Sequence, residues 1–248
     1  TGASSGIGKS TCKVLIKKGY FVFGSVRNKE DAKNLQVKMG KNFLPLIFDV
    51  KSRSEIKSAA KLVKLKLEGQ NLTALVNNAG IAVIGPLQYL PIKDFREQIE
   101  VKLVGTLSCI QEFLPLLGTD PSFSGAPGRI INVSSALGGK IGAPFFGAYC
   151  SSKHALEGMS ESLRRELMLY DIKVSIIAPG AIATPIWGKV KPSSEKKKYS
   201  NTEYSKALDK VLTLLNHLGD TGLSVQTVAN KILKSIEDRK PKLKYYFF

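Results

Sequence analysis

The sequence predicts one α/β domain, in which a mostly parallel sheet is covered by helices on both faces. Strand-like and helix-like patterns alternate at intervals of roughly 20 to 30 residues, which is typical of this class. The expected strands are continuous apolar runs, as burial on both faces requires. A length of 248 residues with 43% hydrophobic content suits one domain. We therefore interpret residues 1–248 as a single doubly wound domain.

The first half of the chain alternates helices with strands. The expected first helix, 7–19, has apolar residues at helical spacing and ends in glycine, a natural C-cap. Apolar strands follow at 20–26 and 43–50. Ser52 and Glu55 then form an S-x-x-E capping box, which predicts the start of another helix. No strand precedes the first helix, so we expect the first strand of the sheet, and any targeting segment with it, to have been trimmed.

The second half continues the same alternation. Its expected elements are, in chain order, a strand at 72–78, a long helix at about 94–117, a strand at 128–135, a helix at 149–168, a strand at 173–180, and a final helix and strand from Ser224 onward. The stretch 181–222 turns polar and rich in lysine. We interpret it as a mobile substrate-binding flap with short helices.

Composition narrows the partners and the compartment. The formal net charge of +17 favours anionic partners, but no basic patch is interleaved with aromatics as in nucleic-acid binders. We expect no nucleic acid and no metal, and at most attraction to an anionic cofactor or membrane surface. Three cysteines without CxxC spacing predict a reduced setting, cytoplasmic or otherwise intracellular. No apolar run reaches the length of about 18 residues that predicts a membrane span.

The first eleven residues, TGASSGIGKST, allow two interpretations. The stretch ends like an ATP-binding P-loop, and under that interpretation Asp49 would help to hold magnesium. A strict P-loop, however, requires glycine where Ala3 stands. Read as Gly2-x-x-x-Gly6-x-Gly8, the same stretch is a dinucleotide-binding turn, whose glycines let the backbone approach a pyrophosphate at a helix N-terminus.

Small and polar residues follow the strands at the edge where open parallel sheets bind ligands. They are Asn77, Asn78, Ala79 and Gly80 after one strand, Ser134 and Ser135 after the next, and Pro179 and Gly180 after another. Tyr149 and Lys153 lie four residues apart on a helix, so their side chains share one face. An ammonium beside a phenol favours the phenolate and lowers its pKa from the ordinary value near 10. This pair is therefore suited to acid–base work, with a serine hydroxyl holding the reacting oxygen.

Taken together, these motifs resemble the short-chain dehydrogenase/reductase family. TGASSGIG, NNAG, NVSS, YCSSK and PG stand in the family's order and at nearly its spacings. The resemblance implies a Rossmann fold, a nicotinamide cofactor, and oxidation of alcohols or reduction of carbonyls. It implies that Tyr149 is the general acid/base, that Lys153 lowers its pKa and binds the nicotinamide ribose, and that Ser135 orients the substrate oxygen. Thr184 is similar to the residue that holds the nicotinamide carboxamide.

The end of the strand at 20–26 predicts the choice of cofactor. Enzymes that select NAD place an acid there, whereas this chain has Ser25 and then Arg27. We therefore favour NADP(H) over NAD(H), with both side chains on the 2′-phosphate; a solvated loop charge is the alternative for Arg27. Asp49 is similar to the family's acidic residue that contacts the adenine. The full expected cofactor set is Gly2, Ser4, Ser5, Gly6, Ile7, Gly8, Ser25, Arg27, Asp49, Val50, Asn77, Ala79, Gly80, Tyr149, Lys153, Pro179, Gly180, Ile182 and Thr184.

Two features depart from the family pattern. The long helix carries Lys102 where the family usually has an asparagine that helps to hold a water connected to the active lysine. A second ammonium near Lys153 predicts a slowed or pH-shifted enzyme, or a nucleotide-binding scaffold or redox sensor that has lost efficient catalysis. The interval from Ser135 to Tyr149 is also one residue longer than usual, which an extra glycine would absorb. Ser134 is the alternative to Ser135.

The expected substrate is hydrophobic. The sequence is most similar to the branch of the family that acts on steroids, retinoids and other lipid alcohols. Phe145, Ile186 and Trp187 are expected to line an apolar pocket, with core or dimer contacts as the alternative. In this family the helix that carries Tyr149 and the long helix before it commonly form a four-helix interface, so we expect a homodimer or homotetramer.

Overall fold

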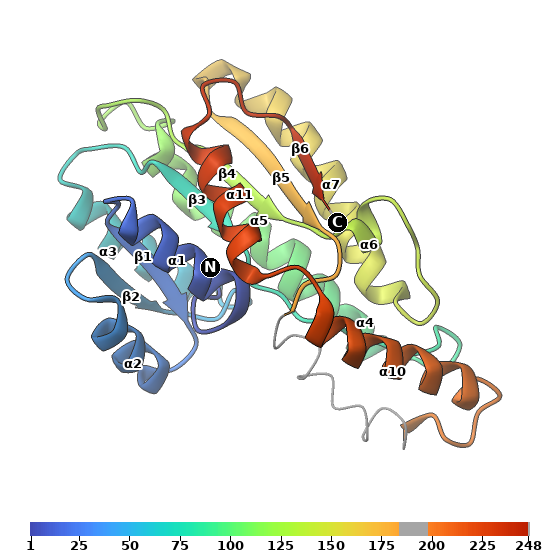
Figure 1. Ribbon diagram of the computed structural model, residues 1–248. Helices are drawn as coiled ribbons and strands as arrows, with labels where there is room; N and C mark the ends of the chain where they lie inside the picture. Colours follow the sequence, from blue (N-terminus) through green and yellow to red (C-terminus); the bar gives the residue numbers. More distant parts are fainter. Residues whose placement is uncertain (184–197, 248) are drawn as a thin grey trace.

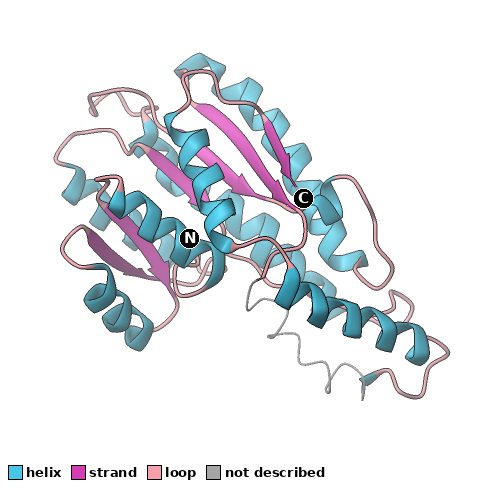
Figure 2. Cartoon of the chain, viewed as in Figure 1, coloured by secondary structure: helices cyan, strands magenta, loops and turns pink. Residues whose placement is uncertain are grey.

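The computed structural model describes residues 1–183 and 198–247 and shows parallel strands between helices (Figure 1, Figure 2). β1 and β2 pair in parallel, and β3, β4, β5 and β6 pair in parallel in that order. The strands are β1 (Val22–Val26), β2 (Phe43–Ile47), β3 (Ala74–Asn77), β4 (Arg129–Val133), β5 (Lys173–Pro179) and β6 (Lys244–Phe247). Their carboxyl ends share one edge, where the predicted site residues gather.

The helices follow the expected order. They are α1 (Gly6–Lys17), α2 (Lys29–Met39), α3 (Arg53–Leu67), α4 (Ile92–Ile99), α5 (Gly105–Phe113), α6 (Ala136–Gly139), α7 (Gly147–Glu166), α10 (Ser205–Thr221) and α11 (Val225–Glu237). The predicted cap at Ser52 is confirmed, because its side chain accepts a hydrogen bond from the Glu55 N–H. At the start of α11, Ser224 likewise accepts one from the Thr227 N–H. The Glu55 carboxylate turns away from the capping box and accepts from the Asp49 N–H at 2.8 Å.

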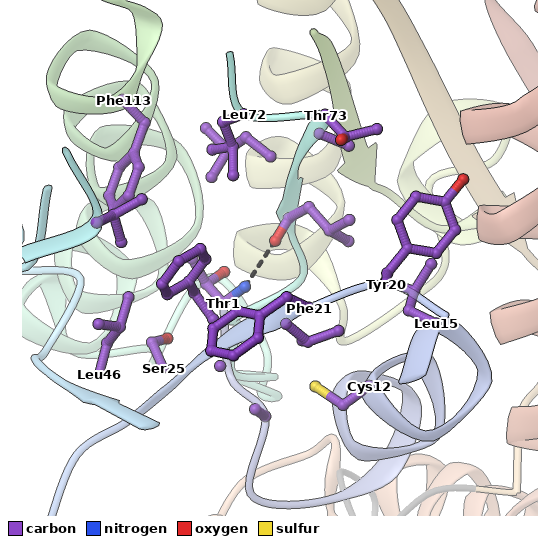
Figure 3. A pocket seen from close by; sticks show the side chains of 18 of the residues that line it. Thr1, Cys12, Leu15, Tyr20, Phe21, Ser25, Leu46, Leu72, Thr73 and Phe113 are labelled. Carbon is purple, nitrogen blue, oxygen red and sulfur yellow. Dashed lines mark hydrogen bonds between the residues drawn. The ribbon is translucent and has the colours of Figure 1, made fainter. Parts of the chain in front are cut away.

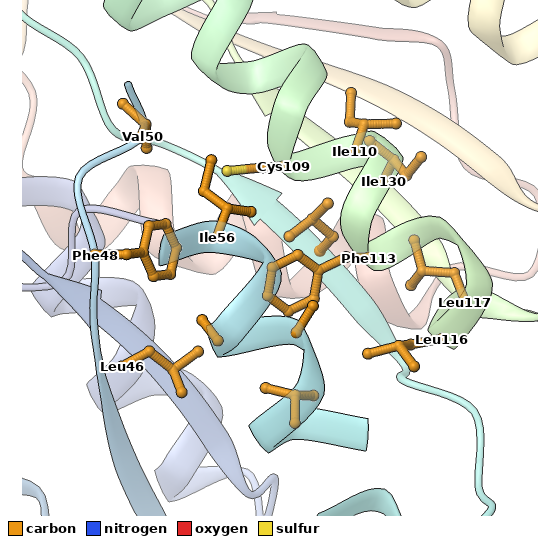
Figure 4. Packing of buried hydrophobic residues seen from close by; sticks show 14 of the residues in the cluster. Leu46, Phe48, Val50, Ile56, Cys109, Ile110, Phe113, Leu116, Leu117 and Ile130 are labelled. Atoms are coloured by element: carbon orange, nitrogen blue, oxygen red, sulfur yellow. The ribbon is translucent and has the colours of Figure 1, made fainter. Parts of the chain in front are cut away.

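Two apolar cores lie on opposite faces of the sheet. Successive residues of β4 point to opposite faces, so Ile130 joins one core and Ile131 the other. α3 and α5 supply the first core (Figure 4), and α1, α2 and α11 supply the second. Burial on both faces explains why the strands are continuous apolar runs, and it confirms the predicted α/β class.

A cavity separates the two groups of strands. Among the described residues β1 and β3 are not paired with each other, and an apolar space of about 310 Å³ lies between them (Figure 3). Phe23, Leu46 and Leu75 contribute to its lining, and the Thr1 amino group donates to the Val76 carbonyl at 2.6 Å beside it.

The stretch 181–222 differs from its prediction. Its described part holds α10, a 17-residue helix, and not only short helices. Leu208, Leu212 and Leu215 recur at helical spacing and are buried in a third apolar cluster with Phe146 and Tyr149. This apolar face accounts for the long helix. None of the helices in the described part of the chain combines the length and apolarity needed to cross a bilayer.

Candidate active site

The Gly-rich turn before α1 has a backbone that only glycine accommodates. Gly2 and Gly6 have φ of 70° and 52°. A Cβ on Gly8 would lie 2.1 Å from the Gly2 carbonyl oxygen, so the turn and the helix are in direct contact. Helix α1 begins at Gly6 and leaves its first N–H groups free of partners within the helix. The turn therefore presents backbone donors and a positive helix end, as a pyrophosphate requires.

Asn78 holds this turn against the end of β3. Its side-chain amide donates to the Thr1 and Gly2 carbonyls at 3.0 and 3.3 Å. Of the two asparagines at this strand end, the expected cofactor set contains only Asn77. The Asn77 side chain is buried within the sheet, where its amide donates to Asn132 Oδ1 at 2.9 Å. Side chains alternate along a strand, so only one of the two neighbouring asparagines faces the turn.

A cavity of about 320 Å³ opens beside the turn. The predicted residues that line it are Gly2, Ser4, Ser5, Gly6, Ile7, Ser25, Arg27, Asp49, Val50, Ala79 and Gly80. Asn78, expected at this sheet edge, also lines the cavity. Sequence reasoning missed the further lining residues Val26, Phe48, Lys51, Ile81, Ala82, Glu97 and Val101. Several of them directly adjoin predicted residues in the chain, which was the available signal. The cavity and its glycine cradle fit the adenosine and pyrophosphate of a dinucleotide.

Among the predicted cofactor residues that do not line this cavity are three near the end of β5. Pro179 ends β5, Gly180 donates its N–H to the Phe247 carbonyl at 2.8 Å, and Ile182 is buried in the core on the α1 side. Thr184, Ile186 and Trp187 lie outside the described residues.

The two side chains that were expected to bind the ribose 2′-phosphate lie in different environments. Ser25 is buried, and its Oγ accepts a hydrogen bond from the Gly2 N–H at 3.0 Å. It thereby holds the Gly-rich turn from the β1 side. Arg27 is exposed at the rim of the cavity and makes no ion pair with a described residue. Lys51 is paired with Glu97 at 2.8 Å across the same cavity.

Tyr149, Lys153 and Ser135 come together where α7 passes the end of β4. Tyr149 and Lys153 are buried on one face of α7, and the lysine Nζ lies 5.3 Å from the centroid of the tyrosine ring. Lys153 donates to the carbonyls of Val133 and Ser134 at 3.1 and 3.2 Å, which fixes it against β4. The Ser135 side chain is hydrogen-bonded to Tyr149.

The pKa of Tyr149 shifts in the direction opposite to the sequence prediction. Burial raises the pKa of Tyr149 to about 12, and the hydrogen bond with Ser135 offsets this only in part. The expected lowering by Lys153 is not seen, because burial is the dominant influence on the phenol. Burial, and then the neighbouring Lys102, hold the pKa of Lys153 well below its ordinary value.

Lys102 lies in the same buried region. It sits in a π turn, Glu100–Val104, that interrupts the long helix between α4 and α5. The residue is 0% exposed, and its Nζ donates to the carbonyls of Ala79 and Asn77 at 3.2 and 3.4 Å. Burial lowers the pKa of Lys102 to about 8, and a hydrogen bond with Lys153 opposes that fall. The predicted encounter of two amino groups is confirmed.

Comparison with known proteins decides the family. The family model described as "short chain dehydrogenase" matches residues 1–195. The chain belongs to the short-chain dehydrogenase family. Its opening turn is therefore a dinucleotide-binding turn and not a P-loop, and the chain is an NAD(P)-dependent oxidoreductase.

Relatives of this short-chain dehydrogenase cover nearly the whole chain. An NADPH-dependent 3-dehydrocapnine reductase from Ornithobacterium rhinotracheale is 39% identical over 99% of this chain and 85% of that protein. Human retinol dehydrogenase 5 is 30% identical over 99% of this chain and 78% of that protein. The closed form of a serine dehydrogenase complexed with NADP+ has a TM-score of 0.80 at 22% identity and covers 99% of this chain and 92% of that chain. That last likeness shows the Rossmann fold alone.

The loop between Ser135 and Tyr149 of this short-chain dehydrogenase contains two tightly packed glycines. Gly138 has φ of 97°, and a Cβ there would lie 2.6 Å from the Lys153 Cβ. A Cβ on Gly139 would lie 2.1 Å from a carboxylate oxygen of Glu157. The loop therefore passes tightly over α7. Ser134, the alternative to Ser135, donates its hydroxyl to Glu157 at 2.7 Å and so faces away from Tyr149.

Proposed function

We propose that this short-chain dehydrogenase transfers hydride between NADP(H) and a hydrophobic carbonyl or alcohol. The observation that carries the proposal is the buried group of Tyr149, Lys153 and Ser135 at the sheet edge that also carries the dinucleotide cavity. Tyr149 is assigned as general acid/base, and Ser135 orients the substrate oxygen. Lys153 holds the ribose and the end of β4.

The protonation of Tyr149 suits carbonyl reduction. A pKa of about 12 keeps the phenol protonated near neutral pH, so it is ready to donate a proton to the carbonyl oxygen as that oxygen becomes an alkoxide. The reduced nicotinamide supplies the hydride when it is bound. The Ser135 hydroxyl, already hydrogen-bonded to Tyr149, holds the same oxygen. The reverse oxidation needs the phenolate and should therefore speed up as pH rises.

The charges at the cavity rim support NADP(H) over NAD(H). Arg27 is exposed at the position where the ribose 2′-phosphate is expected, and it makes no ion pair with an acidic residue in the described part of the chain. No acidic residue follows β1 directly. The relative from Ornithobacterium rhinotracheale is named for NADPH. The chain's net charge of +17 also favours the more anionic cofactor.

The surroundings of Tyr149 support a hydrophobic substrate. Ile84, Phe146 and Leu212 are buried in one cluster with Tyr149, and Phe145 packs against that cluster. The relatives include a reductase of 3-dehydrocapnine and a retinol dehydrogenase. We therefore place 3-dehydrocapnine, a steroid ketone and retinal first among the compounds to test.

One experiment tests both the cofactor and the reaction. The protein is titrated with NADPH, NADH and Mg-ATP, and turnover is followed by the absorbance of reduced nicotinamide with the three ketone or aldehyde classes. We expect NADPH to bind more tightly than NADH. Arg27→Ala should weaken NADPH binding by about tenfold or more, since a charge-assisted contact is worth roughly 1.5–3 kcal/mol, and leave NADH binding nearly unchanged. Equal loss for both cofactors, or binding of Mg-ATP alone, would contradict the proposal.

A further inference from the structure

Glu157 is a buried carboxylate that the proposed reaction does not use. It lies on α7 one helical turn beyond Lys153, and the residue is 4% exposed. A buried charge is tolerated only where hydrogen bonds or opposite charges compensate its lost hydration. Its partners therefore indicate what it holds in place.

One oxygen of Glu157 is directed at the catalytic strand end. Oε1 accepts a hydrogen bond from Ser134 Oγ at 2.7 Å. The carbonyl of Ser134 accepts from Lys153 Nζ at 3.2 Å, and the next residue, Ser135, is hydrogen-bonded to Tyr149. Through Ser134, the carboxylate fixes the end of β4 against the helix that carries the tyrosine and the lysine.

The other oxygen is held by the last strand. Oε2 accepts from the Tyr246 hydroxyl at 2.7 Å, and Lys244 Nζ lies 3.2 Å from it. Lys244 also pairs with Glu161 at 2.6 Å, and the Lys140 ammonium lies 4.5 Å from the centroid of the Tyr246 ring. Because β6 pairs with β5, these contacts connect the far end of the chain to the catalytic region.

The glycine loop after Ser135 is shaped around the same carboxylate. A Cβ on Gly139 would overlap a Glu157 oxygen at 2.1 Å, and the Gly139 carbonyl lies 3.5 Å from the Tyr246 hydroxyl. This is the stretch in which the serine-to-tyrosine interval is longer than usual.

We propose that Glu157 is a positioning residue that ties the C-terminal strand β6 to Ser135 and Lys153. It acts through Ser134 on one side and through Tyr246 and Lys244 on the other. It also places a buried carboxylate close enough to Lys153 to raise the pKa of that lysine. The inference rests on the proposed function, because its effect is exerted on the groups assigned there.

The test compares three variants with the wild type, using NADPH and whichever of the three test carbonyls the wild type reduces. Glu157→Gln keeps the shape and removes the charge. We expect kcat to fall roughly tenfold to hundredfold, because small displacements of reacting groups are costly. The KM for NADPH should stay nearly constant. The pH profile of kcat should also shift, since Glu157 raises the pKa of Lys153 and its removal lowers that pKa further.

Two further variants separate positioning from mere stability. Tyr246→Phe removes one hydrogen bond and leaves the charge, so we expect a smaller loss of kcat and no shift of its pH profile. Glu161→Gln is the matched control, because it breaks an exposed pair with the same Lys244 and should change kcat by no more than about twofold.

The outcomes distinguish this inference from the proposed function. The inference is overturned if Glu157→Gln has the same kcat as Glu161→Gln. It is also overturned if kcat falls only in proportion to the loss of thermal stability while the pH profile of kcat stays where it is in the wild type. If the wild type reduces none of the test carbonyls, and Tyr149→Phe binds NADPH and behaves in the assay as the wild type does, the proposed function fails and the inference fails with it.

Discussion

Lys102 and Lys153 bring two amino groups into one buried region, and their charges compete. The hydrogen bond between them raises the pKa of Lys102 and lowers that of Lys153, while burial lowers both. The sequence predicted this encounter from one residue that departs from the family pattern. It did not predict that the contact shifts the two pKa values in opposite directions, because that depends on the geometry of the folded pair.

Replacing Lys102 by methionine should change how stability depends on pH. In the folded protein the pKa of Lys102 falls from 10.5 to about 8, so below that pH the native state carries a costly buried ammonium. Lys102 should therefore contribute a rise in wild-type stability of roughly 3 kcal/mol between about pH 8 and 10.5, at about 1.4 kcal/mol per unit. Lys102→Met should lose this contribution and keep the one from Lys153, whose pKa is also lowered. Urea unfolding across this pH range measures it.

The control for this prediction is an exposed lysine of the same type. Lys61 is exposed on α3, so Lys61→Met should keep the rise in stability at alkaline pH. A Lys102→Met protein whose stability rises with pH as steeply as the wild type would show that this ammonium is not the origin of the effect.

Helices and strands were predicted most reliably where a local signal marks them. Capping serines located the starts of α3 and α11, and continuous apolar runs located the strands. The π turn at Glu100–Val104 was not predicted, because a single wider turn leaves the apolar pattern of the long helix almost unchanged. α10 was underestimated because its polar, Lys-rich surroundings conceal an apolar face that only its tertiary partners require.

The turn before α1 allows a prediction at the scale of an element. Gly8→Ala would place a Cβ 2.1 Å from the Gly2 carbonyl oxygen, so the turn must shift away from α1. We expect NADPH to bind at least about tenfold more weakly, because the donors at the helix N-terminus no longer converge on one pyrophosphate. Gly158→Ala on α7 is the control, since a Cβ there meets open space. Fluorescence titration with NADPH that gives equal affinities for both variants would rule this account of the turn out.

At the scale of the whole molecule, the fold brings three distant parts of the sequence to one sheet edge. The Gly-rich turn, the end of β4 with α7, and the last strand β6 meet there (Figure 1). The family motifs predicted the first two from the sequence. The third was not predictable, because Tyr246 and Lys244 carry no motif and reach Glu157 only through the pairing of β5 with β6. A single domain and a homodimer or homotetramer remain predictions.

The most direct test of the central claim is turnover by Tyr149→Phe. The account assigns the proton on the reacting oxygen to this phenol, so the variant should lose roughly 10²–10⁴-fold in kcat. NADPH binding and thermal stability should remain close to those of the wild type, because the ring and its apolar neighbours are retained. Unchanged hydride transfer from NADPH to the test carbonyl in a folded Tyr149→Phe protein would contradict the account.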